Sequence, residues 1–185
     1  MYHSGNQMVD PQLLFRKARL EEGMHVADFG CGRTGHLVFP SARAVGAQGL
    51  VYAVDIKKDV LEGIEKRAAL SAIHHIQTVW ANLEEMSHTA IPEKSLDVAF
   101  LVNTLFQIDK AKRRASLAEM TRFLKDKARF VIVDWARRGL AFSPAEERFV
   151  SFPDIREWAR EHGFAVQEEF DVGPYHRGII LFRHE

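Results

Sequence analysis

The stretch "HVADFGCGRTGHL", residues 25–37, decides how the rest of the chain is interpreted. It passes from apolar residues into a glycine-rich turn and contains the pattern G-x-G-x-x-G as Gly30, Gly32 and Gly35. Glycine lets the backbone turn sharply and approach a ligand without a Cβ in the way. Because the pattern follows an expected strand and opens an expected helix, it predicts a nucleotide-binding turn.

Segments of strand and helix character alternate along the chain, which predicts a parallel sheet with helices on both faces. The last two expected strands are joined too closely for a parallel crossover, so we expect them to pair antiparallel. The expected fold is α/β, a Rossmann-like seven-stranded sheet that is mostly parallel with one antiparallel C-terminal strand. The expected strands are 24–29, 50–56, 75–81, 95–103, 128–135, 165–170 and 177–183, and the expected helices are 36–47, 58–70, 110–125 and 152–164.

The bulk properties limit the function classes. A length of 185 residues suits one domain over 1–185, in which residues 1–23 are expected to form an N-terminal lid helix. Acidic and basic residues balance at 25 each, which gives no strong case for nucleic acid as a partner. Cys31 is the single cysteine, and no apolar run is long enough to span a membrane. We therefore expect a cytoplasmic protein, with the oligomeric state left open.

Three classes of nucleotide ligand have to be separated. The phosphate-binding loop of nucleoside triphosphatases needs Lys and Ser/Thr where this chain has His36 and Leu37, which excludes it. A nicotinamide cofactor fits the glycines and Asp55, a carboxylate that can accept hydrogen bonds from both ribose hydroxyls. Asp28, two residues before Gly30, would repel a pyrophosphate, and a cationic ligand without phosphate removes that conflict.

At this point the sequence resembles the class I S-adenosylmethionine-dependent methyltransferases. The matching stretches are "VADFGCGRTG", "VYAVDI", "WANLEEM" and "LDVAFLVNTLFQI", which follow one another in the family's order over about residues 24–134. The tail "EEFDVGPYHRGIILF" resembles a subgroup close to the quinone-biosynthesis enzymes, of the methyltransferase type 11/31 kind. The resemblance implies S-adenosylmethionine as cofactor and methyl transfer to an unidentified acceptor. Large acceptors usually need recognition insertions and none is visible in this sequence, so we expect a small-molecule acceptor.

The resemblance also implies roles for particular residues. Asp28 would organise the glycine turn near the cofactor's amino group, and Asp55 would hold the ribose. Asn82 stands where the family usually has Asp, and Thr34 stands where many relatives have glycine; these are two departures from the pattern. The expected cofactor-binding residues are Asp28, Gly30, Cys31, Gly32, Gly35, Asp55, Ile56, Asn82, Leu83 and Asn103.

No catalytic residue is assigned; Asn103 and His176 are the candidates, with His36 and Asp134 as further possible bases. No Cys/His cluster indicates a metal site. "KAKRR" at 110–114 is interpreted as a solvated helix start, with contact to an anionic substrate left open. Four aromatic residues after the fifth strand indicate either an apolar acceptor pocket or ordinary packing: Trp135, Phe142, Phe149 and Phe152.

Two alternative functions stay open at the level of sequence. One is a non-catalytic S-adenosylmethionine-binding partner subunit, to which the departures at Thr34 and Asn82 give some weight. The other is an NAD-dependent oxidoreductase, which Asp28 and the short chain disfavour.

Overall fold

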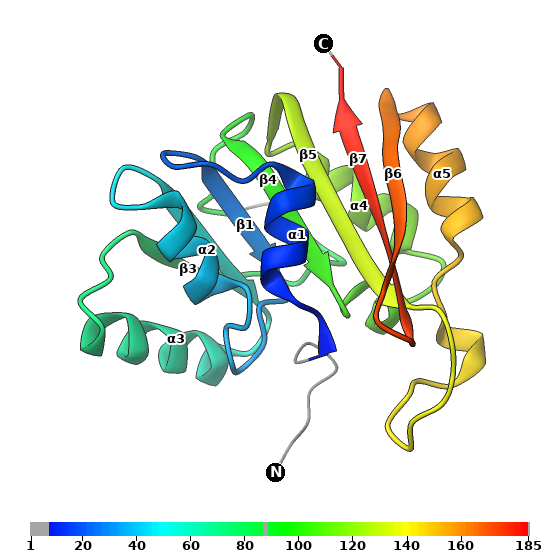
Figure 1. The fold of residues 1–185 in the computed structure, drawn as a ribbon, viewed down its shortest axis with the longest axis horizontal. Coiled ribbons are helices and arrows are strands. Elements are labelled where there is room, and N and C mark those ends of the chain that lie inside the picture. The colour runs from blue at the N-terminus through cyan, green and yellow to red at the C-terminus, as the bar shows by residue number, and fades with distance from the viewer. Residues whose placement is uncertain (1–7, 87–88, 185) are drawn as a thin grey trace.

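The computed structural model describes residues 8–86 and 89–184. Its seven strands form one sheet in the order β3-β2-β1-β4-β5-β7-β6 (Figure 1). Strands β1 to β5 are parallel, and β7 runs antiparallel to both β5 and β6, so the predicted fold is confirmed. The strands are β1 (His25–Phe29), β2 (Leu50–Asp55), β3 (Ile76–Trp80), β4 (Leu96–Val102), β5 (Leu124–Trp135), β6 (Phe164–Val172) and β7 (His176–Arg183).

Helices cover both faces of the sheet, and two separate apolar clusters fill the space beneath them. Helices α1 (Pro11–Ala18), α2 (Val38–Val45) and α3 (Lys58–Leu70) pack on one face; α4 (Arg113–Thr121) and α5 (Phe152–Glu161) pack on the other. Two short 3₁₀ helices, η2 (Leu105–Gln107) and η3 (Glu146–Arg148), lie in the connections after β4 and β5. Among the described residues, no helix is long and apolar enough to cross a membrane.

Helix α3 shows how the sequence sets an element. It has the bounds that the sequence predicts, and the four residues with helical spacing are its buried ones: Val60, Leu61, Ile64 and Ala68. The apolar stripe recurs every three or four residues and therefore faces the sheet. Helix α5 is fixed at its ends instead, because the Ser151 side chain accepts from the Asp154 N–H and Gly163 follows with a φ of 75°.

The helix expected at 110–125 is shorter than predicted, because α4 covers only Arg113–Thr121. It starts late because the Asp109 side chain accepts from the Ala111 N–H at 2.9 Å, which holds that segment in a turn. It ends early because Leu124 pairs with Leu96 as the first residue of β5. The apolar spacing continues past the boundary, but strand pairing determines the structure there.

The N-terminal segment contains one helix within the predicted lid. Asp10 caps α1 by accepting from the Gln12 N–H, and Leu14, Phe15 and Ala18 are buried against the sheet. Residues 1–7 of the predicted lid lie outside the described residues. A lid role for the segment 1–23 stays a prediction.

Candidate active site

A cavity of about 580 Å³ lies where β1, β2, β3, β4 and β5 reach their carboxyl ends. This is the edge at which open α/β sheets bind ligands. Its lining includes seven of the residues that the sequence predicts for the cofactor: Gly30, Gly32, Asp55, Ile56, Asn82, Leu83 and Asn103. Asp28, Cys31, Gly35 and His176 are not part of the lining.

The glycine turn is held tightly at its first glycine. The N–H groups of Gly30 and Cys31 both donate to the Val54 carbonyl of β2, at 2.8 and 2.9 Å. Gly30 has a φ of 82°, and a Cβ built on it would lie 2.4 Å from Thr104 Oγ1. Glycine at this position therefore serves both the backbone conformation and the close approach of the segment after β4.

Gly35, the third glycine of the pattern, is required for packing rather than for the cavity. Gly35 has a φ of 53°, and a Cβ there would lie 2.5 Å from Ile64 Cδ1 and 2.9 Å from the Phe39 ring. The glycine at 35 is therefore explained by packing of the turn on α3 and α2. Thr34, the departure from the family pattern, places its carbonyl where Arg67 donates to it at 2.6 Å.

Asp55 is fixed by the main chain. Its two carboxylate oxygens accept from the N–H groups of Gly32 and Lys57, each at 3.0 Å. An ionised carboxylate has about four acceptor positions, so each oxygen can accept a further hydrogen bond. The carboxylate is thus oriented at the cavity wall and still able to bind two hydroxyl groups of a ligand.

An apolar surface adjoins Asp55 in the same cavity. Ile56 is 52% exposed, although its side chain is large and aliphatic, and Leu83, which follows β3 in the chain, lines the same cavity. The Trp80 indole donates to the Ile56 carbonyl at 2.8 Å, which fixes the backbone at this position. Ligand pockets are lined mainly by apolar side chains, so Ile56 and Leu83 suit an apolar ligand group.

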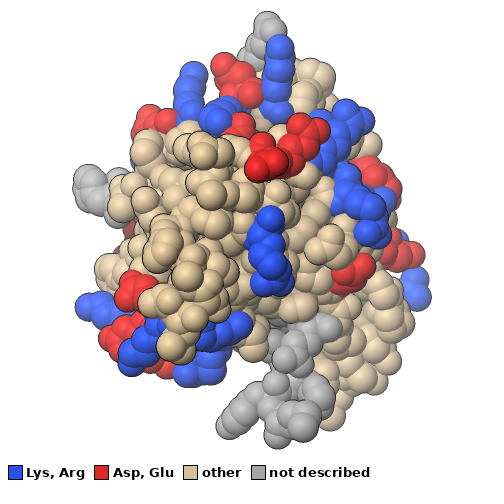
Figure 2. All heavy atoms as spheres, turned by 60° about the vertical axis from the view of Figure 1, so that its left-hand side comes forward, with Lys and Arg blue, Asp and Glu red and all other residues tan. Residues whose placement is uncertain are grey.

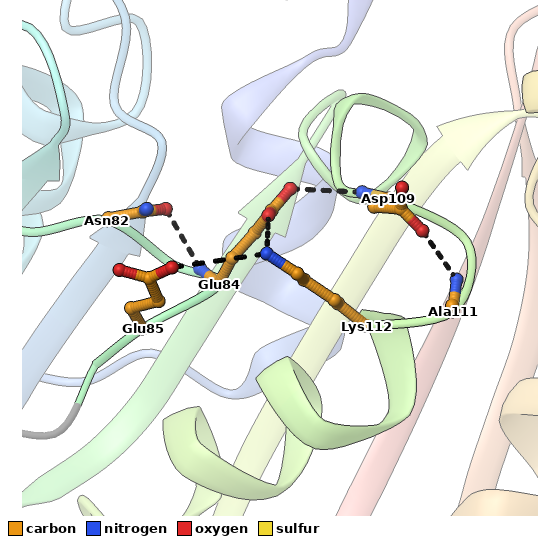
Figure 3. A network of polar contacts seen from close by, with 6 residues as sticks. All are labelled: Asn82, Glu84, Glu85, Asp109, Ala111 and Lys112. Carbon is orange, nitrogen blue, oxygen red and sulfur yellow. Dashed lines mark hydrogen bonds and ion pairs between the residues drawn. The ribbon is translucent and has the colours of Figure 1, made fainter.

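A polar network joins the two walls of the cavity (Figure 3). The Glu84 carboxylate accepts from the Asp109 N–H at 3.1 Å and from Lys112 Nζ at 2.9 Å. The Glu84 N–H donates to Asn82 Oδ1 at 3.0 Å. Asn82 therefore caps the local turn, and its carbonyl oxygen keeps a second acceptor position for a ligand.

Asp28 lies under the turn and is only 3% exposed. Burial, with a further contribution from the charge of Asp55, raises the pKa of its carboxyl to about 7. Cys31 is buried beside it, and burial raises the pKa of its thiol further above the ordinary value. A thiol in this state is a poor nucleophile at neutral pH, in agreement with a packing role.

The raised pKa of Asp28 predicts a pH dependence of stability. A carboxyl whose pKa is higher in the folded than in the unfolded protein contributes stability that is complete below the unfolded value of 3.8 and lost as pH rises through about 7. The free energy of unfolding should therefore fall between about pH 5 and pH 8. In Asp28→Asn this fall should be smaller by about 2 kcal/mol.

Urea denaturation of the ligand-free protein at both pH values measures this difference. Asp134 also has a raised pKa and stays in both proteins, so the difference between wild type and variant isolates Asp28. Asp126→Asn, at an exposed position of β5, is the control. An unchanged slope in Asp28→Asn would show that Asp28 does not titrate in this range.

Asn103 stands out among the catalytic candidates. It follows β4 with a φ of 52°, a strained conformation for a residue with a side chain. It lines the cavity, and neither atom of its buried side-chain amide has a hydrogen-bond partner among the described residues. Buried amide groups in proteins are nearly always paired, so the cavity offers both a donor and an acceptor to a ligand.

The other candidate bases are placed differently. Asp134 is fully buried and accepts from the N–H groups of Phe106 and Trp135, so it positions the backbone after β4. His36 Nε2 contacts the Val9 carbonyl at 2.6 Å. Neither lines the cavity, and His176 lines a second, separate cavity.

Aromatic side chains form the other end of the first cavity. Trp135 and Phe142 both line it and meet edge to face, with ring centroids 6.0 Å apart. This end is completed by Phe106, Gln107 and Ile108, which were not predicted as site residues. They end the stretch "LDVAFLVNTLFQI", and its match to the family pattern could have indicated them as site residues. Of the other predicted aromatics, Phe149 and Phe152 line different cavities.

Arg113 ties together the two loops that border the aromatic end. It donates to the carbonyls of Phe106 and Ile108 on one loop, at 3.3 and 3.2 Å. It also donates to Arg148 and Phe149 on the other loop, at 2.8 and 3.1 Å. The expectation that 110–114 is solvated is therefore wrong for Arg113, which is 9% exposed.

Arg113→Met should lower the free energy of unfolding by about 3 kcal/mol, since several buried carbonyls lose a charged donor. Chemical denaturation measures this loss. The matched control is Arg114→Met, because the neighbouring Arg114 is exposed and pairs only with Glu161 among the described residues. Equal stability losses in the two variants would contradict a clamping role for Arg113.

Comparisons with known proteins agree with the site. A family model described as "Methyltransferase domain" matches residues 20–172. Aklanonic acid methyltransferase DauC of Streptomyces sp. (strain C5) is 34% identical over 76 residues, 41% of this chain and 33% of that protein. A 2-phytyl-1,4-naphtoquinone methyltransferase of Trichormus variabilis is 29% identical over 149 residues, 80% of this chain and 60% of that protein. The matches thus span about a third and three fifths of these relatives.

Among solved structures, a SAM dependent methyltransferase from Aquifex aeolicus has a TM-score of 0.81 at 22% identity, over 95% of this chain and 90% of that one. At this identity the likeness concerns the fold. The family match covers most of the chain, and the chain belongs to the methyltransferase domain family. It belongs to the class I methyltransferases, as the sequence predicts. The NAD-dependent alternative is thereby set aside.

Proposed function

We propose that this chain transfers the methyl group of S-adenosylmethionine to a small, flat and largely apolar molecule. The observation that carries the proposal is the asymmetry of the cavity. One end presents the glycine turn and the Asp55 carboxylate, and the other end presents the rings of Trp135 and Phe142. Asn103 lies between them with an unpaired amide.

The residues at the polar end fit the cofactor by their chemistry. Asp55 accepts from the ribose hydroxyls through the acceptor positions that the backbone leaves. Ile56 and Leu83 hold the adenine, and the second acceptor position of Asn82 receives its amino group. Gly30 and Gly32 leave room for the methionine part. The fixed Asp55 and the exposed Ile56 support this assignment.

The chemistry then depends on position. The cofactor supplies a methyl group that is already activated by the sulfonium. Phe106, Trp135 and Phe142 hold the acceptor and exclude water, and the Asn103 amide orients its nucleophilic atom toward the methyl. Alignment of this kind contributes on the order of 7–11 kcal/mol to catalysis when reactants are well placed.

The N-terminal segment 1–23 serves as a lid in this proposal, within a single domain over 1–185. A contact between the Val9 carbonyl of this segment and His36, which directly follows the glycine turn, supports that role. We also infer a cytoplasmic location from the single, buried and unpaired Cys31, which suits a reducing compartment.

A small acceptor rather than a nucleic acid agrees with the surface charge. On the face that Figure 2 shows, acidic and basic side chains are interspersed around an uncharged area. A nucleic-acid partner would favour a basic patch of one sign.

Incubation with methyl-labelled S-adenosylmethionine and fractionated cell extract tests the function. We expect the label in a low-molecular-weight fraction that partitions into organic solvent. Label in RNA or protein would overturn the acceptor class. Cofactor binding without transfer to any fraction would overturn catalysis and favour the non-catalytic binding subunit.

A further inference from the structure

A second cavity, of about 260 Å³, adjoins the first at the start of β7 and of α5. Trp135 separates the two cavities. Its ring lines the first cavity and packs on the ring of His176 in the second, with centroids 4.3 Å apart. Tyr175 also lines the second cavity, and Gly139 packs closely on its ring, since a Cβ at Gly139 would lie 2.4 Å from it. None of the roles proposed above uses this space.

His176 is the feature of the second cavity that calls for a ligand. Its side chain lines the cavity and is 2% exposed, yet neither ring nitrogen has a hydrogen-bond partner among the described residues. A neutral imidazole has one N–H donor and one acceptor. An unpaired buried polar group destabilises the fold, so a partner at either nitrogen would be stabilising. Burial lowers the pKa of His176 to about 4, so the ring is neutral at physiological pH and donates one N–H.

The charges around the cavity indicate what that partner is. Arg137 and Arg177 both line the cavity and bring two cations to it. The first turn of α5 adds little, because Ser151 Oγ already accepts from the Asp154 N–H and Pro153 has no N–H to donate. Asp171 is the one carboxylate in the lining, and it is occupied in part by Arg177, whose Nε lies 3.6 Å from Asp171 Oδ1.

We propose that the second cavity is an anion site, in which His176, Arg137 and Arg177 bind a carboxylate or phosphate group. The group has two conceivable sources with the same chemistry. It is either an acid group of the methyl acceptor, reaching past Trp135, or a separate small anion. The site itself does not depend on the function proposed for the first cavity.

The test uses inorganic phosphate and acetate as probes and the imidazole proton signals of His176 as readout in NMR. We expect at least one probe to shift these signals in a saturable manner and to raise the pKa of His176, since a bound anion stabilises the charged ring. Arg177→Gln should weaken this binding by about tenfold, the loss of one charged hydrogen bond. His74→Gln, at an exposed histidine, is the matched control and should leave binding of the probe anion unchanged.

Binding of S-adenosylhomocysteine, measured by calorimetry, should stay the same in His176→Gln and Arg177→Gln, which separates this site from the cofactor site. If phosphate inhibits methylation of the acceptor, the anion site binds an acid group of the acceptor. If methylation proceeds unchanged in phosphate, the site binds a separate small anion. The proposal is overturned if neither probe gives a saturable shift at His176, or if Arg177→Gln and His74→Gln respond alike.

Discussion

Asp55→Ala should bind S-adenosylmethionine about a hundredfold more weakly than the wild type, since two charge-assisted hydrogen bonds to ribose are worth about 3 kcal/mol. The carboxylate also anchors the turn, because it accepts from the Gly32 and Lys57 N–H groups. Part of the loss will therefore come from a turn that is less well ordered before binding. Isothermal calorimetry with S-adenosylhomocysteine measures the combined effect.

The control is Asp126→Ala, which removes an exposed carboxylate near the start of β5, far along the strand from its carboxyl end. It should leave cofactor affinity unchanged. Circular dichroism should show that Asp55→Ala keeps its secondary structure. A folded Asp55→Ala variant with wild-type affinity would remove the ribose assignment.

Gly30→Ala is the second substitution with a large expected effect. The new Cβ would lie 2.4 Å from Thr104 Oγ1, and the backbone there has a φ of 82°. The turn and the segment after β4 must therefore move apart, and both line the cavity. Strain of about 1–3 kcal/mol at such positions, added to the clash, predicts a loss of cofactor affinity of at least about tenfold.

Gly63→Ala is the matched control for this change. A Cβ at Gly63 meets nothing within 4 Å, and the residue lies inside α3. Alanine in a helix interior is more favourable than glycine by about 0.5–1 kcal/mol, so this variant should melt at a higher temperature with unchanged binding. Thr104→Ser in the Gly30→Ala background should recover part of the affinity, because it removes the methyl group that the Cβ would also meet. Wild-type binding by Gly30→Ala would contradict the tight turn.

Most of the fold follows from local patterns in the sequence. The buried strands and α3 repeat their apolar residues with periods of a strand or a helix, and those periods are visible within a short window. The end of α4 was missed because Leu117, Met120 and Leu124 keep helical spacing across the boundary. Leu124 is part of β5 because it pairs with Leu96, a partner that no local window contains.

The candidate site likewise has parts that a short window of sequence predicts and parts that depend on distant residues. The glycine turn and the carboxylate at the end of β2 stand next to recognisable strands, so sequence indicated them. The fit of Gly30 against Thr104, the clamp of Arg113 on Arg148, and the stacking of Trp135 on His176 join residues far apart in the chain. Only the folded sheet brings these groups together.

The reversed direction of β7 has a consequence for synthesis. This strand leaves the ribosome after β5 and β6, yet it is inserted between them in the sheet (Figure 1). Until it arrives, the nascent chain carries an unpaired edge along Val131–Val133, which is completely buried in the finished protein. Open apolar edges of this kind promote aggregation. A message truncated before His176 should therefore yield an insoluble product rather than a partly active one.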